Sequence, residues 1–123
     1  MNQLSDETIL YRAIKTKGWV DPDEGSVDAN AFKLRVDEEY LSASLKQEHS
    51  YRGLNKCYGV IAVRVSTLRR LGLNPVIDEK DPDYVKIYDL PSNEDEQLAI
   101  DIGISIAEEA EIVSNWLDRP LRK

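Results

Sequence analysis

An apolar helical segment in the last third of the chain constrains the fold more than any other feature. The run from Leu90 to Val113 joins helix-start residues to apolar residues at helical spacing. On a wheel of 3.6 residues per turn, the apolar positions form three ridges: Leu98, Ile102 and Ile106; Ala99, Gly103 and Ala107; Ile100 and Ile104. Only a narrow stripe is polar. We therefore expect most of the helix circumference to be buried.

The residues before this run predict where the helix begins. Pro91 cannot continue a strand ladder, and Ser92 or Asn93 can accept hydrogen bonds from the first free N–H groups. The acidic residues that follow place negative charge at the positive end of the helix dipole. The pattern predicts a helix over Asn93–Ala107, and the ridge of Ala and Gly favours close approach to a flat sheet.

Length and composition favour one small domain. The chain has 123 residues and a formal net charge of −7, with 41% hydrophobic residues, which suffices for one core. We expect a flexible N-terminus at 1–7, one domain at 8–115 and an irregular tail at 116–123. No apolar run approaches the roughly 20 residues of a spanning helix, and Met1–Leu10 lacks the basic and apolar regions of a signal peptide. These features, with Cys57 as the single cysteine, predict a soluble cytoplasmic protein that does not bind membranes.

Several shorter segments read as strands or helical turns. Strands are predicted at 8–14, 40–45, 58–65 and 84–88, with shorter ones at 75–77 and 111–113. Asp28 can cap a helical turn at 29–32, a short helix is expected at 66–71, and 46–54 is a short helix or a loop. Because the strands lack helices of ten or more residues between them, a doubly wound fold is disfavoured. We predict an α+β domain with a mixed β-sheet packed against one long buried helix.

Charge and the titratable residues exclude several functions. The acidic balance disfavours nucleic acid as a partner. Arg64, Arg69 and Arg70 can either hold an anion or pair with nearby acids, and we favour pairing. The acidic loop at 21–25 does not have the register of a calcium loop, and His49 is the single histidine, so no metal site is predicted. We expect His49 on the surface and Cys57 in the core.

One ordered set of residues resembles a known enzyme group. Arg12 lies in LYR, Ser42 and Ser44 lie in YLSAS, and Glu109 and Glu111 lie in EAEIV. This order resembles the arginine, Ser-x-Ser and Glu-x-Glu pattern of the arginine-serine-glutamate ADP-ribosyltransferases. The resemblance implies NAD as substrate, with Arg12, Ser42 and Glu111 as catalytic residues. The guanidinium would grip phosphate, and the carboxylate would stabilise the oxocarbenium-like ribose. Outside this resemblance no cofactor is predicted.

The same residues also have a structural interpretation. Arg12 shares a strand face with Leu10 and Ile14, where its stem can lie across apolar surface. The two serines suit the outward side of a half-buried strand. A second resemblance runs from LYRAI through a tryptophan-containing loop to AF, LS and a G-V strand. It is similar to a set of small uncharacterised bacterial proteins and implies no activity.

The aromatic residues favour a different class of function. Tyr84 and Tyr88 fall on one strand face with Lys86, and Trp116 lies in the C-terminal tail near Arg119. Tyr, Trp and Arg are the residue types that anchor protein interfaces. We therefore predict a protein-interaction or accessory module, self-association included, with Tyr84, Tyr88 and Trp116 as binding residues. A small NAD-using enzyme is the alternative.

Overall fold

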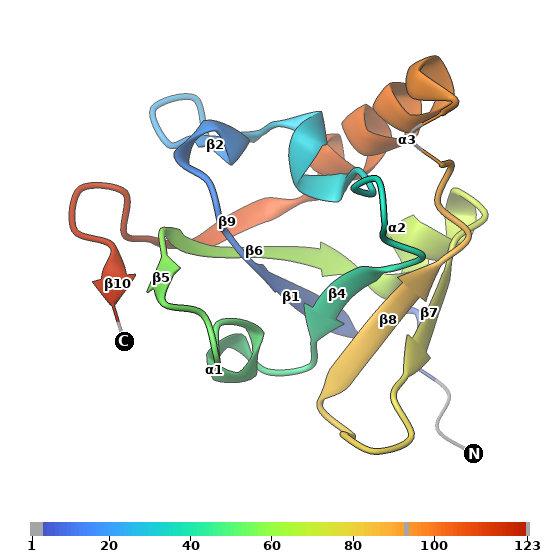
Figure 1. Cartoon of the computed structure of the whole chain (residues 1–123), viewed down its shortest axis with the longest axis horizontal. Coiled ribbons are helices and arrows are strands. Elements are labelled where there is room, and N and C mark those ends of the chain that lie inside the picture. The colour runs from blue at the N-terminus through green and yellow to red at the C-terminus, as the bar shows by residue number, and fades with distance from the viewer. Residues whose placement is uncertain (1–3, 93, 123) are drawn as a thin grey trace.

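The computed structural model describes residues 4–92 and 94–122, and Figure 1 shows their arrangement. The strands are β1 (Ile9–Ala13), β2 (Val20–Asp21), β3 (Ser26–Val27), β4 (Leu41–Ser44), β5 (Lys56–Cys57), β6 (Gly59–Arg64), β7 (Asn74–Ile77), β8 (Tyr84–Tyr88), β9 (Glu111–Asn115) and β10 (Leu121–Arg122). The helices are η1 (Lys17–Trp19), η2 (Ala29–Phe32), α1 (Gln47–Ser50), α2 (Val65–Arg70) and α3 (Glu96–Glu109).

Six strands form the main sheet, in the order β7-β8-β4-β1-β6-β9. Its strand pairs are antiparallel within the described residues, where we expected mixed pairing. Parallel neighbours need a long crossover, usually a helix, and α3 is the one long helix among the described elements. The α+β class and the long helix beside a sheet are confirmed.

The two faces of the sheet have different coverings. One face carries the core side chains, among them Leu10, Leu41, Ile61 and Ile87, and is covered by η2 and α3. The opposite face carries the serines of β4 and the tyrosines of β8, and α1 lies against it beside β1 and β4 (Figure 1). The predicted alternation along β4 and β8 is confirmed, because inward residues are buried and outward residues are half-exposed or polar.

The long helix begins later and is less buried than its sequence predicts. Asp95 is its N-cap, and the carboxylate accepts a hydrogen bond from the Leu98 N–H at 3.3 Å. The predicted caps were Ser92, which accepts from the Glu94 N–H instead, and Asn93, which lies outside the described residues. A carboxylate at Asp95 also suits the helix dipole, so the start moves to Glu96.

Burial of α3 is confined to the ridge of small residues. Leu98 is 46% exposed and Ile104 is 44% exposed, so the expectation of a helix buried over most of its circumference is wrong. The buried residues are Ala99, Gly103, Ile106 and Ala107. Most contacts of α3 are with η2, which is a single short turn. Leu98 and Ile104 therefore stay partly exposed.

The small ridge packs on η2 and not directly on a flat sheet. A Cβ atom added at Gly103 would lie 2.7 Å from the carbonyl oxygen of Ala29 in η2. Asp28 holds η2 as predicted, since its side chain accepts a hydrogen bond from the Asn30 N–H at 2.8 Å. Glycine at position 103 therefore permits the closest approach of the two helices.

Both chain ends make contacts with the domain. Leu4, in the segment expected to be flexible, is buried, and Arg69 bonds both its carbonyl oxygen and the Asp6 carboxylate. Arg70 pairs with Glu109, so two of the three clustered arginines pair with acids as we favoured. In the tail expected to be irregular, β10 pairs with β5. No helix in residues 4–92 and 94–122 combines the length and apolar character needed to cross a membrane.

The contact at Gly103 can be tested by Gly103→Ala. Alanine gains about 1 kcal/mol of helix propensity over glycine, but overpacking against backbone costs roughly 1–3 kcal/mol. We expect a net loss of about 1 kcal/mol in the free energy of unfolding, measured by urea denaturation. The control is Ser105→Ala on the same helix, expected to change stability by less than about 0.5 kcal/mol. A stabilised Gly103→Ala protein would contradict the close packing.

Candidate functional site

A pocket of about 220 Å³ opens beside β1, β4 and α1. Its wall combines polar, aromatic and cationic side chains. The lining residues are Tyr11, Arg12, Ala13, Lys15, Ser42, Ala43, Ser44, His49, Ser50, Arg52, Leu54 and Tyr84. Two of the three residues predicted as catalytic, Arg12 and Ser42, line this pocket, and so does Tyr84 from the predicted binding set.

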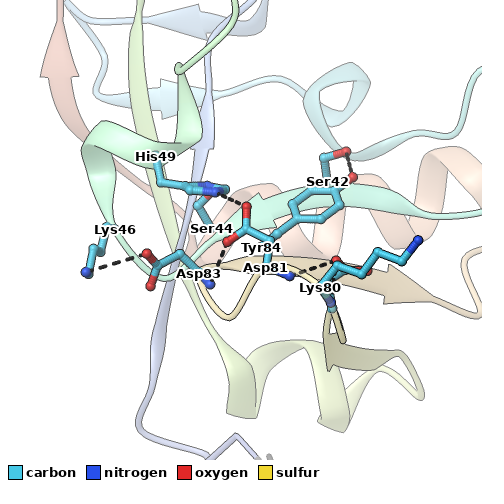
Figure 2. Close-up of polar contacts among 9 residues, drawn as sticks. Ser42, Ser44, Lys46, His49, Lys80, Asp81, Asp83 and Tyr84 are labelled. Carbon is cyan, nitrogen blue, oxygen red and sulfur yellow. Dashed lines mark hydrogen bonds and ion pairs between the residues drawn. The ribbon is translucent and has the colours of Figure 1, made fainter.

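Three side chains form a hydrogen-bonded chain at this pocket. The Oγ of Ser44 lies 2.7 Å from Nδ1 of His49, and Nε2 of His49 lies 2.6 Å from Oδ2 of Asp81. Figure 2 shows the imidazole close to Ser44 and its contact with the Asp81 carboxylate. The His49 side chain is 11% exposed, so the expectation of a surface histidine is wrong. The short link from β4 to α1 folds the imidazole back onto the sheet.

The carboxylate determines how the imidazole is protonated. An ionised Asp81 can only accept hydrogen bonds, so Nε2 of His49 carries a proton and donates it to Asp81. In the neutral ring, Nδ1 is then an acceptor, and the Ser44 hydroxyl donates to it. The hydrogen bond from His49 holds the pKa of the Asp81 carboxyl below its usual value, which keeps it ionised at neutral pH. Ser44 therefore faces a base.

The loop between β7 and β8 holds Asp81 in this position. The Asp78 carboxylate accepts hydrogen bonds from the N–H groups of Lys80 and Asp81. Oδ1 of Asp81 in turn accepts from the Asp83 N–H at 3.1 Å, and Lys46 pairs with the Asp83 carboxylate (Figure 2). Such side-chain to backbone bonds are the ones that stabilise Asp-containing turns. The loop is thereby fixed against α1.

Ser42 bonds a tyrosine and not a catalytic base. Its Oγ lies 2.9 Å from the hydroxyl of Tyr84. Figure 2 draws this contact as a dashed line. Burial raises the pKa of Tyr84, so its phenol stays protonated at neutral pH and can donate or accept a hydrogen bond. Tyr84 and Tyr88 both pack against Tyr40, at ring-centroid distances of 6.5 and 5.5 Å.

Arg12 enters the pocket wall from the side of the sheet that η2 covers. Its Nε donates to the Ala31 carbonyl oxygen at 2.7 Å, and its Nη1 donates to the Ser42 carbonyl oxygen at 2.8 Å. The described residues of β1 and β4 pair at Tyr11 and Ser44. Beyond this pair the strands separate, and the guanidinium of Arg12 donates to the Ser42 carbonyl oxygen in place of a strand partner. The Trp19 ring covers it, with Cζ 5.3 Å from the ring centroid.

One nitrogen of this guanidinium stays accessible. Among the described residues, Nη2 of Arg12 has no hydrogen-bond partner, and no buried side-chain nitrogen or oxygen there lacks one. Nη2 therefore contacts solvent, and the pocket is the opening that Arg12 lines. Burial lowers the pKa of Arg12 to about 10, so it remains charged at neutral pH. Burial and then repulsion from Arg12 lower the pKa of Lys15.

Glu111, the third predicted catalytic residue, lies elsewhere. It lies on β9, where it pairs with Ala62 of β6, and it lines a separate hollow with Ile9 and Arg64. The strands β1 and β6 lie between β9 and β4, so Glu111 is roughly 14 Å from Ser44 at about 4.8 Å per strand. Arg12, Ser42 and Glu111 do not converge. The structural interpretation gave Arg12 an apolar contact for its stem, whereas the structure shows a buried guanidinium that donates to two carbonyl oxygens.

The predicted binding residues fall into two separate contacts. Tyr84 and Tyr88 share one strand face, as predicted from β8. Trp116 packs edge-to-face on Tyr51, with ring centroids 5.4 Å apart. The sequence missed His49, Asp81, Lys15 and Arg52 as site residues. The only signal was the short spacing between Ser44 and His49, because Asp81 is 32 residues from His49 in the chain.

Substituting Arg12 by methionine tests its structural role. Methionine keeps the apolar stem but leaves the carbonyl oxygens of Ala31 and Ser42 without their donors. Each buried acceptor left unpaired costs about 1–3 kcal/mol, partly offset by removal of a buried charge. We expect a loss of about 2 kcal/mol in the free energy of unfolding, measured by urea denaturation. Arg52→Met, an exposed residue of the same pocket, should change stability by less than about 0.5 kcal/mol.

Comparison of this chain with protein-family models, with curated proteins and with solved structures returned no match in any of the three.

Proposed function

We propose that the protein binds a small phosphate-bearing molecule in the pocket beside β1, β4 and α1. The observation that carries this proposal is the charge of the wall. Its charged residues are Arg12, Lys15 and Arg52, and none of the described lining residues is an Asp or Glu. The chain as a whole has 23 acidic residues against 16 Lys and Arg. A wall whose charged residues are all cations, in an acidic protein, favours an anionic ligand.

The electrostatics of Lys15 support the same conclusion. Its pKa is lowered first by burial and then by the charges of Arg12 and Arg35, and the charge of Glu38 offsets this lowering only in part. A bound anion would relieve this repulsion and raise the pKa of Lys15 again. The guanidinium of Arg12 is rigidly held by two carbonyl oxygens, so it offers Nη2 to a ligand with little further loss of side-chain entropy.

The size and polarity of the pocket limit the ligand. A volume of about 220 Å³ is smaller than the roughly 300–1,000 Å³ of sites for drug-sized molecules. It suits a phosphate with a small substituent or one end of a nucleotide. Hydroxyl groups from Ser42 and Tyr11 line the same wall and can donate hydrogen bonds to phosphate oxygens, whereas the Ser50 hydroxyl donates to the Gln47 carbonyl oxygen.

Calorimetric titration with AMP, NAD and inorganic pyrophosphate tests the proposal. We expect at least one of these anions to bind, and Arg52→Ala and Lys15→Ala each to raise its Kd by about tenfold, because each removes a charged contact worth about 1.4 kcal/mol. The matched control is Arg119→Ala, an exposed arginine outside the pocket, which should leave the Kd unchanged. Binding should also weaken as salt increases.

Two results would contradict this function. The first is that none of the three anions binds at millimolar concentration. The second is that binding is indifferent to both Arg52→Ala and Lys15→Ala.

An NAD-using activity is the second candidate, and one observation favours it. Arg12 and Ser42 line the same pocket, as the resemblance to ADP-ribosyltransferases requires. The position of Glu111 weighs against it, because a carboxylate on β9 is too distant to stabilise the ribose at this pocket. Nicotinamide release from NAD decides between the two. Turnover lost in Glu111→Ala would support the transferase and contradict the ligand pocket proposed here.

The role as a protein-interaction module stays a prediction. Tyr84 contributes a hydroxyl to the pocket wall, so in our proposal its function is to shape that wall. Tyr88 and Trp116 remain the residues through which an interaction or self-association would be tested by light scattering.

A further inference from the structure

We infer that Ser44 is a nucleophile activated by His49, and that the pocket catalyses acyl transfer from small esters that carry a negative charge. The nucleophile and its base go beyond the binding function proposed above, whereas the preference for an anionic ester rests on it. The three side chains come from two parts of the chain, the segment from β4 to α1 and the loop between β7 and β8, and they form one hydrogen-bonded chain.

The geometry has the features of an activated serine. Both hydrogen bonds, Ser44 to His49 and His49 to Asp81, are short, at 2.7 and 2.6 Å. A nucleophile, a base within hydrogen-bond reach and a third group that orients the base are the general requirements for nucleophilic catalysis. Asp81 accepts from Nε2, so Nδ1 is the atom that faces Ser44 and is free to take its proton.

Burial adds selectivity to this arrangement. Ser44 is 3% exposed, and it lines the pocket, so only a molecule that enters the pocket can reach its hydroxyl. The other serine of β4 provides an internal comparison, because Ser42 bonds a tyrosine hydroxyl and has no base within its hydrogen bonds.

The reaction follows from these positions. The Ser44 oxygen attacks the ester carbonyl carbon while its proton passes to Nδ1 of His49, and the resulting imidazolium is stabilised by Asp81. The carbon–oxygen bond to the alcohol then breaks, and the alcohol leaves with the proton from Nδ1. This step yields an acyl-serine. Water attacks that acyl group with His49 again taking the proton, which releases the acid and restores Ser44.

The wall of the pocket defines the substrate class. The cations Lys15 and Arg52 lie on the same wall as Ser44 and can hold a carboxylate or phosphate on the substrate. Positive charge there also favours the negative charge that develops on the carbonyl oxygen in the transition state. A pocket of about 220 Å³ admits a short acyl group.

Labelling with phenylmethylsulfonyl fluoride tests the nucleophile directly. The serine oxygen attacks sulfur and fluoride leaves, so peptide mapping by mass spectrometry locates the adduct. We expect the adduct on Ser44, no adduct there in Ser44→Ala, and a labelling rate on the order of 100-fold lower in His49→Asn and Asp81→Asn. Asp81→Asn retains the shape of the side chain but removes the ionised acceptor that determines which imidazole nitrogen carries the proton.

Asp83→Asn is the matched control, since it makes the same change in the same turn. The Asp83 side chain pairs with Lys46. Among the described residues it makes no hydrogen bond with His49, which bonds Asp81 instead. Its labelling rate should stay within about twofold of the unmodified protein, and circular dichroism should show all variants folded. An adduct confined to other residues, no adduct at all, or a rate independent of His49 would overturn the inference.

A pair of esters separates this inference from the proposed binding function. We compare p-nitrophenyl acetate with the anionic mono-p-nitrophenyl glutarate, and expect about tenfold faster release of nitrophenol from the anionic ester, a preference that Arg52→Ala reduces. Equal rates that both depend on Ser44 would support the nucleophile and overturn the anionic substrate class. Hydrolysis of neither ester would overturn the catalytic role, whatever the anion titrations show.

Discussion

The buried guanidinium of Arg12 is the interaction on which the rest of the structure depends. It connects η2 to the strand β4 through the carbonyl oxygens of Ala31 and Ser42, under the ring of Trp19. A buried charge is costly unless its hydrogen bonds are satisfied, so these partners have to stay in place. Arg12 thereby fixes η2 on one face of the sheet and one wall of the pocket on the opposite face.

The distribution of charge explains how an acidic chain can form a cationic pocket. Many of its carboxylates serve local backbone structure. Asp28 and Asp95 cap helices, and Asp78 and Asp81 accept N–H groups in the loop before β8. Acids used in this way lie at the ends of elements, where free N–H groups are available. The residues that line the pocket instead contribute hydroxyl groups and cations, so the sign of the net charge does not describe the site.

The elements of the fold were predictable where local chemistry decides them. Asp28 predicted η2 because a carboxylate before a helical turn accepts its free N–H groups, and the alternation of β4 and β8 predicted which side chains face the core. The burial of α3 was not predictable from its periodicity. Leu98 and Ile104 are as apolar as Ile106, yet only Ile106 meets a covering layer. Periodicity shows that a helix has an apolar side, but the amount of surface available to cover it depends on the whole chain.

The same distinction applies to the site. The sequence by itself determined only that Ser44 and His49 are five residues apart, and their contact was not predicted from it. Asp81, Pro82 and Asp83 are typical turn-forming residues, so the sequence also predicts a turn there. Only the tertiary structure decided that this turn reaches His49, since the pairing of Ser44 with Tyr84 brings the β7–β8 loop beside α1. It likewise decided that Glu111 is excluded, because two strands lie between β9 and β4. Strand order and register are set by the combined burial of all the strands, and no short pattern of residues contains that information.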